Sequence, residues 1–178
     1  MRADIDLGRI CDEVSRMLRY NGHENACITA AALLARVLHI LGYTNSYPLT
    51  VCVKIFNAAF QRWAEKHGGI DDEASEEACY DAGGFEINVG RGAPEAEDQW
   101  AGHLSVLIPK YFDERHALLD LTIIQADRPD VQIVLRPLCL KADDVFIDGK
   151  RPLSVLCNDC LLDYQAYPDG HTYGDWKS

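Results

Sequence analysis

The chain has 178 residues, of which 48% are hydrophobic and 25% charged; this composition is typical of a globular domain and unlike that of disordered, collagenous or coiled-coil chains. Since roughly 150 residues per domain is the usual expectation, we predict a single domain over residues 1–178. The formal net charge of -11 lacks the basic footprint that binding to a phosphate backbone requires, so nucleic acid is not an expected partner.

Seven cysteines are scattered along the chain. Their odd number, in a chain long enough to fold without a disulfide framework, indicates reduced thiols. The charged N-terminal residues show no apolar run of a signal peptide. The most apolar stretch, residues 26–41, carries Arg36 and His39 and falls short of the roughly 20 apolar residues of a membrane span. We therefore expect no membrane association and, by default, the cytoplasm, with unconventional secretion not excluded.

The N-terminal third of the sequence predicts helices followed by a strand. Residues 4–20 place apolar side chains at near-helical spacing, as an amphipathic first helix does. The next segment, NACITAAALLARVLHILG, is rich in Ala and Leu and indicates a helix buried on most of its surface, with Cys27 in its first turn. Residues 47–56 are rich in β-branched and aromatic side chains, which predicts a strand, and residues 57–67 predict a short helix.

Residues 68–99 contain Gly pairs and the acidic run DDEASEE, and we expect a loop-rich insert with one strand-like piece at 85–89 and a solvated acidic face. Beyond it the sequence turns to strand-like runs, which predicts an antiparallel sheet connected by hairpins. Helices first and strands afterwards indicate the α+β class, with the Cys27 helix packed on the sheet. The expected strands are GHLSVLIP, ALLDLTII, VQIVLRPLCL and a short VFID.

Three residues in these elements suggest a catalytic group: Cys27 at a helix start, His103 in a strand and Asp120 in the next strand. A helix N-terminus favours a thiolate and offers N–H groups to an oxyanion. If the strands of His103 and Asp120 pair as a hairpin, the carboxylate can accept the imidazole N–H and orient the ring. Each residue also has a structural interpretation, as a buried thiol, a core histidine and a paired carboxylate.

These residues lie in a pattern that resembles the transglutaminase-like superfamily, which has a papain-like cysteine fold. The pattern comprises the Cys-bearing helix ending in Leu-Gly, W-x-x-H-L-S-V-L-I, and L-L-D-L-T-I-I-Q-A-D-R-P. The resemblance covers roughly residues 25–129, with the acidic segment as an insert. It implies that Cys27 is the nucleophile, His103 the general base and acid, and Asp120 the orienting residue, with Thr122 a supporting neighbour.

The sequence departs from the pattern in one respect. Papain-type peptidases place a Gln before the Cys as an oxyanion donor, and this chain has no Gln upstream of Cys27; Asn21, six positions earlier, is the candidate instead. Trp100, three positions before His103, is a candidate wall of the substrate groove or a packing residue. The resemblance implies no cofactor, and calcium dependence is not implied because the further domains of calcium-dependent animal transglutaminases do not fit in this length.

The expected function is that of a cysteine-dependent hydrolase or acyltransferase that forms a thioester at Cys27 with the amide-type carbonyl of a peptide or protein. Peptidase, deamidase, transglutaminase and N-acyltransferase activities stay open, as does the oligomeric state. An acyltransferase that uses coenzyme A would need a cationic patch, which the acidic composition disfavours. A non-catalytic module that binds a peptide or protein is the alternative.

A second cysteine motif, LCNDCLLD, pairs Cys157 with Cys160, and His171 follows. A structural zinc site needs four ligands, and a single C-x-x-C does not supply them. We therefore expect two ordinary reduced thiols and no bound metal.

Overall fold

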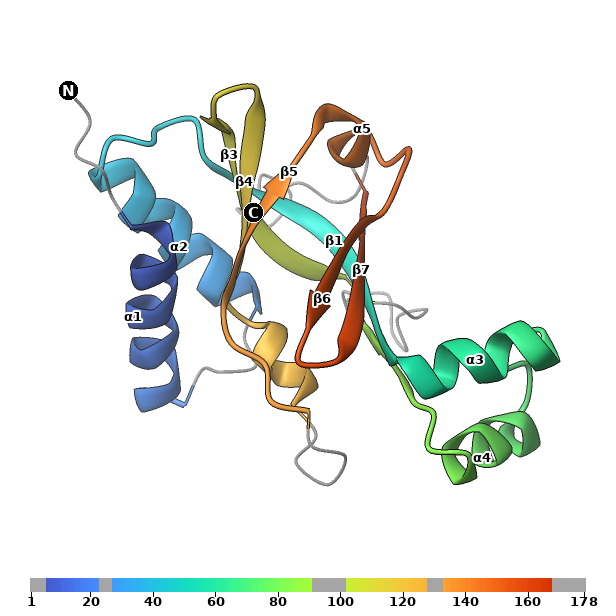
Figure 1. Cartoon of the computed structure of the whole chain (residues 1–178). Helices are drawn as coiled ribbons and strands as arrows, with labels where there is room; N and C mark the ends of the chain where they lie inside the picture. Colours follow the sequence, from blue (N-terminus) through green and yellow to red (C-terminus); the bar gives the residue numbers. More distant parts are fainter. Residues whose placement is uncertain (1–5, 23–26, 91–101, 128–132, 168–178) are drawn as a thin grey trace, which may run out of the picture.

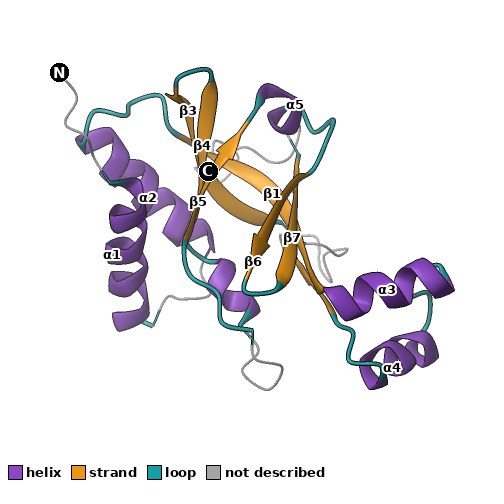
Figure 2. Cartoon of the chain, viewed as in Figure 1, coloured by secondary structure: helices purple, strands orange, loops and turns teal. Residues whose placement is uncertain are grey.

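The computed structural model describes residues 6–22, 27–90, 102–127 and 133–167. Within these residues, the central feature is a seven-stranded sheet in which all neighbouring strands are antiparallel (Figure 2). The strand order is β5-β4-β3-β1-β7-β6, and β2 also pairs with β1. The strands are β1 (Tyr47–Asn57), β2 (Glu86–Val89), β3 (His103–Phe112), β4 (Arg115–Asp120), β5 (Leu138–Ala142), β6 (Leu153–Cys157) and β7 (Cys160–Ala166).

Two helices, α1 and α2, lie side by side against one side of the sheet, and α3 and α4 form an arm that projects at the far end of β1 (Figure 1). The short α5 follows β5. The chain therefore has the α+β class and the antiparallel sheet that the sequence predicts. The helices are α1 (Leu7–Tyr20), α2 (Cys27–Ile40), α3 (Ala58–His67), α4 (Glu73–Asp81), the 3-10 turn η1 (Ile123–Ala126) and α5 (Asp144–Ile147).

The eleven-residue strand β1 organises the sheet because it pairs with three other strands. One edge of β1 pairs with β3 along residues 47–51 and with β2 along residues 53–56. The other edge pairs with β7 from Val51 to Asn57. The end of β2 and the start of β3 therefore meet beside the middle of β1.

Two hydrophobic cores fill the two faces of the sheet. One packs α1 and α2 against Leu104, Val106 and Ile108 of β3. The other lies on the opposite face, where alternate residues of β1 meet Leu162 and Tyr164 of β7. Because side chains alternate between faces along a strand, His103 shares the face of the second core, while its neighbour Leu104 faces the helices.

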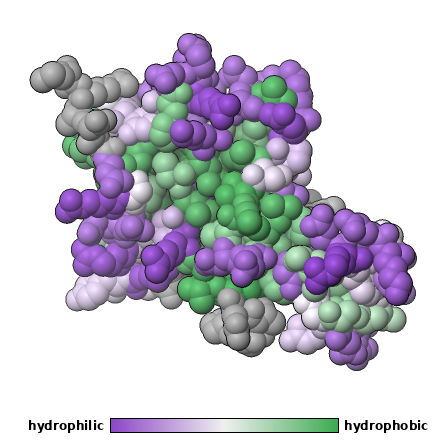
Figure 3. All heavy atoms as spheres, viewed as in Figure 1, coloured by the Kyte–Doolittle hydropathy of each residue, from purple (hydrophilic) through white to green (hydrophobic). Residues whose placement is uncertain are grey.

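On the face that Figure 3 shows, hydrophilic side chains lie around the rim and apolar side chains gather at the centre, over β6. Leu156 of β6 is 74% exposed. In the part of the chain that the structure describes, none of the helices is long and apolar enough to cross a membrane.

The acidic insert is more regular than the sequence predicts. The last five residues of the run DDEASEE form the first turns of α4, which begins at Glu73, and strand β2 follows at Glu86–Val89. Asp72 and Ser75 form a capping box, in which each side chain accepts a backbone N–H, and acidic residues in the first turn favour the helix dipole. The expectation of a loop-rich segment is therefore wrong for residues 73–81.

Three other expectations in the second half of the chain need correction. The strand ALLDLTII ends at Asp120, since the following residues turn into η1. The segment VFID belongs to α5, because Asp143 caps a helical turn by accepting the N–H of Phe146. In VQIVLRPLCL, only the end from Leu138 enters β5, beyond Pro137, which has no N–H for a strand ladder.

The hairpin of β6 and β7 has no counterpart in the sequence expectations. Cys157 and Cys160 pair across it, and the two turn residues between them, Asn158 and Asp159, both have positive φ. This is the geometry of a two-residue hairpin turn, for which Asn and Asp are suited. The hairpin matters for the site because it places β7 beside β1.

Packing of α2 on the sheet should dominate stability. Leu34, on the buried face of α2, is fully buried, so we expect Leu34→Ala to lower the free energy of unfolding by about 2–5 kcal/mol. Ile40→Ala, at a position 75% exposed, is the control and should change it by less than about 0.5 kcal/mol. Urea denaturation measures both, and equal losses in the two variants would contradict the packing.

Candidate functional site

The structure brings His103 and Asp120 together as a buried pair. The Nε2 of His103 lies 3.0 Å from Oδ1 and 2.9 Å from Oδ2 of Asp120, and neither residue has any exposed area. A carboxylate at this distance accepts the Nε2–H, which leaves Nδ1 as the nitrogen that can take a proton. The pair therefore presents a base of defined tautomer and orientation.

The hairpin of β3 and β4 positions the pair, as the sequence predicts, but the two residues are not directly opposite each other. The register pairs Val106 with Leu119, and its continuation places Ser105 opposite Asp120. His103 is therefore the diagonal neighbour, which the long imidazole side chain can still reach. The last residue of one strand and the first of the other meet at the same end of the sheet.

Cys27 is the first residue of α2, and its side chain is half-buried. Its thiol interacts with the imidazole of His103 and contributes to the raised pKa of that ring. Asp120 occupies Nε2 with both oxygens, so Nδ1 is the ring nitrogen that can exchange a proton with the thiol. Cys27, His103 and Asp120 thus form one connected group, in the order that a nucleophile, a base and an orienting residue require.

Asp120 accepts hydrogen bonds from three further groups in addition to His103. Its Oδ1 accepts the backbone N–H groups of Thr122 (3.1 Å) and Ile123 (3.0 Å), and its Oδ2 accepts the hydroxyl of Tyr164 (3.0 Å). Thr122 therefore supports the site through its backbone. A buried carboxylate costs free energy unless hydrogen bonds compensate its lost hydration, and these four donor groups supply that compensation.

Tyr164 is a member of the group that the sequence did not indicate. It lies on β7, is fully buried, and is 44 positions from Asp120. Burial and the charge of Asp120 raise the pKa of its phenol well above 10, so the hydroxyl stays a donor. The sequence did not indicate Tyr164 because the hairpin of β6 and β7 was not predicted. The alternation of polar and apolar residues in LLDYQA is the signal that could have revealed strand β7.

Gln125 is a second residue that was missed. Its Nε2 lies 2.9 Å from Nδ1 of His103, and its side chain is half-buried. It reaches the ring because the chain turns into η1 directly after β4, which brings position 125 back over the site. The motif D-L-T-I-I-Q contains this residue. Its β-branched residues predict a continuous strand, and in a continuous strand Gln125 would not return to the ring of His103.

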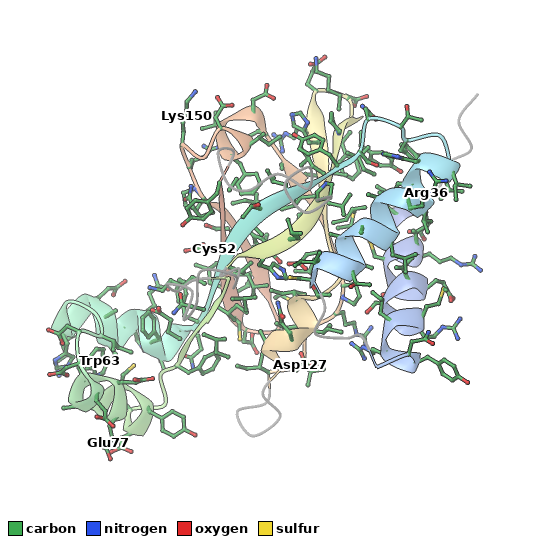
Figure 4. The ribbon with its side chains drawn as sticks, turned by 180° about the vertical axis from the view of Figure 1, so that it is seen from behind. Arg36, Cys52, Trp63, Glu77, Asp127 and Lys150 are labelled. Carbon is green, nitrogen blue, oxygen red and sulfur yellow. The ribbon has the colours of Figure 1, made fainter. Side chains whose placement is uncertain are left out.

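The backbone around His103 is closely packed. Gly90, after β2, has φ +76°, and a Cβ added to it would lie 2.5 Å from the backbone nitrogen of His103. The thiol of Cys52, on β1, donates to the carbonyl oxygen of Gly90 at 2.6 Å. In the view from behind, the labels of Cys52 and Asp127 locate β1 and the residue that follows η1 (Figure 4). The backbone of His103 is thus enclosed by the end of β2, which β1 supports through Cys52.

Electrostatics favour the protonated form of His103. Burial lowers its pKa, but the charge of Asp120 and the hydrogen bonds to Asp120 and Cys27 outweigh burial and raise the pKa from 6.5 to about 10. Burial raises the pKa of the thiols of Cys11, Cys79, Cys139 and Cys160, which lowers the reactivity of these four thiols.

Two other residues expected near the site are placed differently. Asn21 ends α1, and its Nδ2 donates to the carbonyl oxygen of Met17 at 2.8 Å, so its amide already serves the helix end; its oxyanion role stays a prediction. Trp100 lies outside the described residues. Among the residues that are described, no three or more His, Cys, Asp or Glu side chains form a group that could hold a metal ion.

The raised pKa of His103 makes stability depend on pH. A group whose pKa is higher in the folded state stabilises the fold fully below its unfolded pKa of about 6.5, and this contribution is lost as pH rises through about 10. We expect the free energy of unfolding to fall more steeply between pH 7 and pH 10 in the wild type than in His103→Gln, as measured in urea. Parallel curves would contradict the buried ion pair.

Gly90 offers a test of the packing around His103. Gly90→Ala adds both the strain of a positive φ and a clash with His103, whereas Gly83→Ala, at the same φ of +76° with nothing within 4 Å of the added Cβ, adds strain alone. The strain costs about 1–2 kcal/mol. We expect Gly90→Ala to destabilise more than Gly83→Ala and, unlike it, to slow alkylation of Cys27 by iodoacetamide; equal effects would show that the clash is relieved elsewhere.

The chain was also compared with known proteins. No family model matches it, and neither a curated protein nor a solved structure does. The resemblance to the transglutaminase-like superfamily therefore stays a prediction from the residues, and the geometry of the site carries the functional argument.

Proposed function

We propose that the chain is a cysteine-dependent hydrolase or acyltransferase that acts on an amide-type carbonyl through a thioester at Cys27, as a single-domain member of the transglutaminase-like superfamily. The observation that carries the proposal is the connected group of Cys27, His103 and Asp120. Its carboxylate end is fully buried and its thiol end is half-buried, so the base is protected from water while the nucleophile can be reached.

The thioester would form in two steps. The Sγ of Cys27 attacks the carbonyl carbon, His103 holds the thiol proton at Nδ1, and the electron pair of the C=O bond moves to the oxygen. Backbone N–H groups at the start of α2 are the donors for this oxyanion. The C–N bond then breaks as His103 gives its proton to the departing amine.

The thioester is resolved by water or by a second amine. The attacking molecule gives a proton to His103, the carbon–sulfur bond breaks, and the sulfur takes the proton back. Asp120 stabilises the imidazolium in each half of the cycle and need not change its own protonation. The same residues thus support hydrolysis and transfer, and the acceptor that enters the site decides between them.

The first test is the reactivity of the thiol. We expect iodoacetamide at pH 7 to label Cys27 on the order of tenfold faster than the other half-buried thiols, Cys52, Cys139 and Cys157, because a thiolate is the reactive form. His103→Ala should remove this advantage. Mass spectrometry of the labelled peptides measures the rates. If Cys27 reacts no faster than the other half-buried thiols, the chain is better regarded as a peptide-binding or protein-binding module.

The second test separates the possible reactions. A glutamine-containing peptide is incubated with the wild type and with Cys27→Ala, each with and without an added primary amine. Cleavage yields two shorter peptides, deamidation converts the glutamine to glutamate, and transfer attaches the amine; mass spectrometry distinguishes these products. We expect one of them with the wild type and none with Cys27→Ala. Equal product from both proteins would exclude Cys27 as the nucleophile.

A further inference from the structure

The Nδ1 atom of His103 contacts a side chain that does not react in the proposed mechanism. Asp120 occupies Nε2 with both oxygens. At Nδ1 the ring meets Gln125, whose Nε2 lies 2.9 Å away, while the thiol of Cys27 also interacts with this imidazole. The role of Gln125 is therefore a separate question from the roles of the three reacting or orienting residues.

We propose that Gln125 is a positioning residue that holds the imidazole of His103 toward Cys27 in both of its protonation states. This inference rests on the proposed function, because it concerns the cycle in which His103 takes and returns a proton. It assigns a role to a residue that acts through His103 and not on the substrate.

The chemistry of a primary amide suits this role. When Nδ1 carries no proton, the amide N–H of Gln125 donates to its lone pair, which is the arrangement with Nε2 at 2.9 Å from Nδ1. When Nδ1 is protonated, the form that the raised pKa of His103 favours, rotation of the amide by half a turn presents Oε1, which accepts the Nδ1–H. A carboxylate can serve only the protonated state, and an apolar side chain serves neither. Glutamine thus keeps the ring in one orientation while the proton moves.

The backbone that carries Gln125 is fixed by the site itself. Asp120 accepts the N–H groups of Thr122 and Ile123, which start η1. Ile123 and Ala126, on either side of Gln125 in this turn, are buried at 0% and 1% exposure. One carboxylate therefore orients His103 at Nε2 and also places the turn whose amide meets Nδ1, which couples the two contacts on the ring.

The experiment uses the full-length chain and two substitutions. Gln125→Glu keeps the shape but can only accept a hydrogen bond, and Gln125→Met keeps much of the length but does neither. Two controls match them: Gln61→Glu changes an exposed amide of α3, and Gln165→Met removes a half-buried amide that donates to the carbonyl of Gly149. Urea denaturation confirms that each variant is folded before its site is measured.

The first readout is the protonation of the ring. Nitrogen NMR of 15N-histidine-labelled protein follows Nδ1 and Nε2 of His103 between pH 6 and pH 11. Among the residues that the structure describes, the groups that face this ring are Asp120 of β4, Cys27 of α2 and Gln125 of η1, with Tyr164 of β7 behind Asp120. We expect Gln125→Glu to keep both nitrogens protonated to a higher pH than the wild type, and Gln125→Met to shift Nδ1 without this gain.

The second readout divides the reaction into its halves. With p-nitrophenyl acetate as the acyl donor, a burst of nitrophenol reports acylation of Cys27, and the steady rate reports hydrolysis of the thioester. We expect Gln125→Glu to retain the burst but to lower the steady rate by about tenfold or more, because a locked imidazolium cannot accept the proton of water. Gln125→Met should slow both phases and also alkylation by iodoacetamide.

The outcomes distinguish failure of this inference from failure of the proposed function. If the wild type shows a reactive Cys27 and a burst, but both Gln125 variants behave like their controls in NMR and kinetics, the inference is wrong and the proposed function stands. Loss of both phases to the same extent in Gln125→Glu and Gln125→Met, with identical ring titrations, would reduce Gln125 to a packing residue. An unreactive Cys27 in the wild type would overturn the proposed function, and the inference with it.

Discussion

The carboxylate of Asp120 is the group on which the site depends. It is fully buried, and a buried charge is tolerated only when donors replace its hydration. The donors come from three elements: His103 from β3, the backbone of Thr122 and Ile123 at η1, and Tyr164 from β7. Each of these elements must be in place before the carboxylate is satisfied, so one polar group links the local turn to the closure of the sheet.

The sheet explains why these donors converge. Strand β1 lies between β3 and β7, and this brings the first residue of β3 and the middle of β7 to the same face of the sheet. Helix α2 packs on the opposite face of β3, and its first residue, Cys27, reaches around the strand end to the ring of His103. The thiol of Cys27 and the imidazole of His103 therefore come from opposite faces of β3, and the end of the strand is where they can meet.

The surroundings of the site also restrict how His103 moves. Gly90 touches its backbone, and Gln125 lies at its free nitrogen. A base that must take and return a proton benefits from a ring that keeps its orientation, because misplacement by a fraction of an ångström weakens proton transfer. The half-buried thiol is the open side of this otherwise enclosed group.

The sequence by itself determined the elements with strong local signals and the identity of the three central residues. The periodicity of α1, the Ala- and Leu-rich α2 with Cys27 in its first turn, the β-branched β1 and the hairpin of His103 and Asp120 all follow from short-range patterns. Where local signals conflicted, as in ALLDLTII, β propensity favoured a strand, while the hydrogen bonds of Asp120 to the following N–H groups stop it at position 120.

Only the tertiary structure decided the partners that come from far along the chain. Tyr164 joins Asp120 because β7 pairs with β1, and strand order is set by long-range burial and backbone pairing that no short window contains. Gln125 meets Nδ1 because a buried turn folds back over the ring. Residue types and local periods thus indicated the chemistry, whereas the geometry that connects it arose from contacts between strands 44 positions apart.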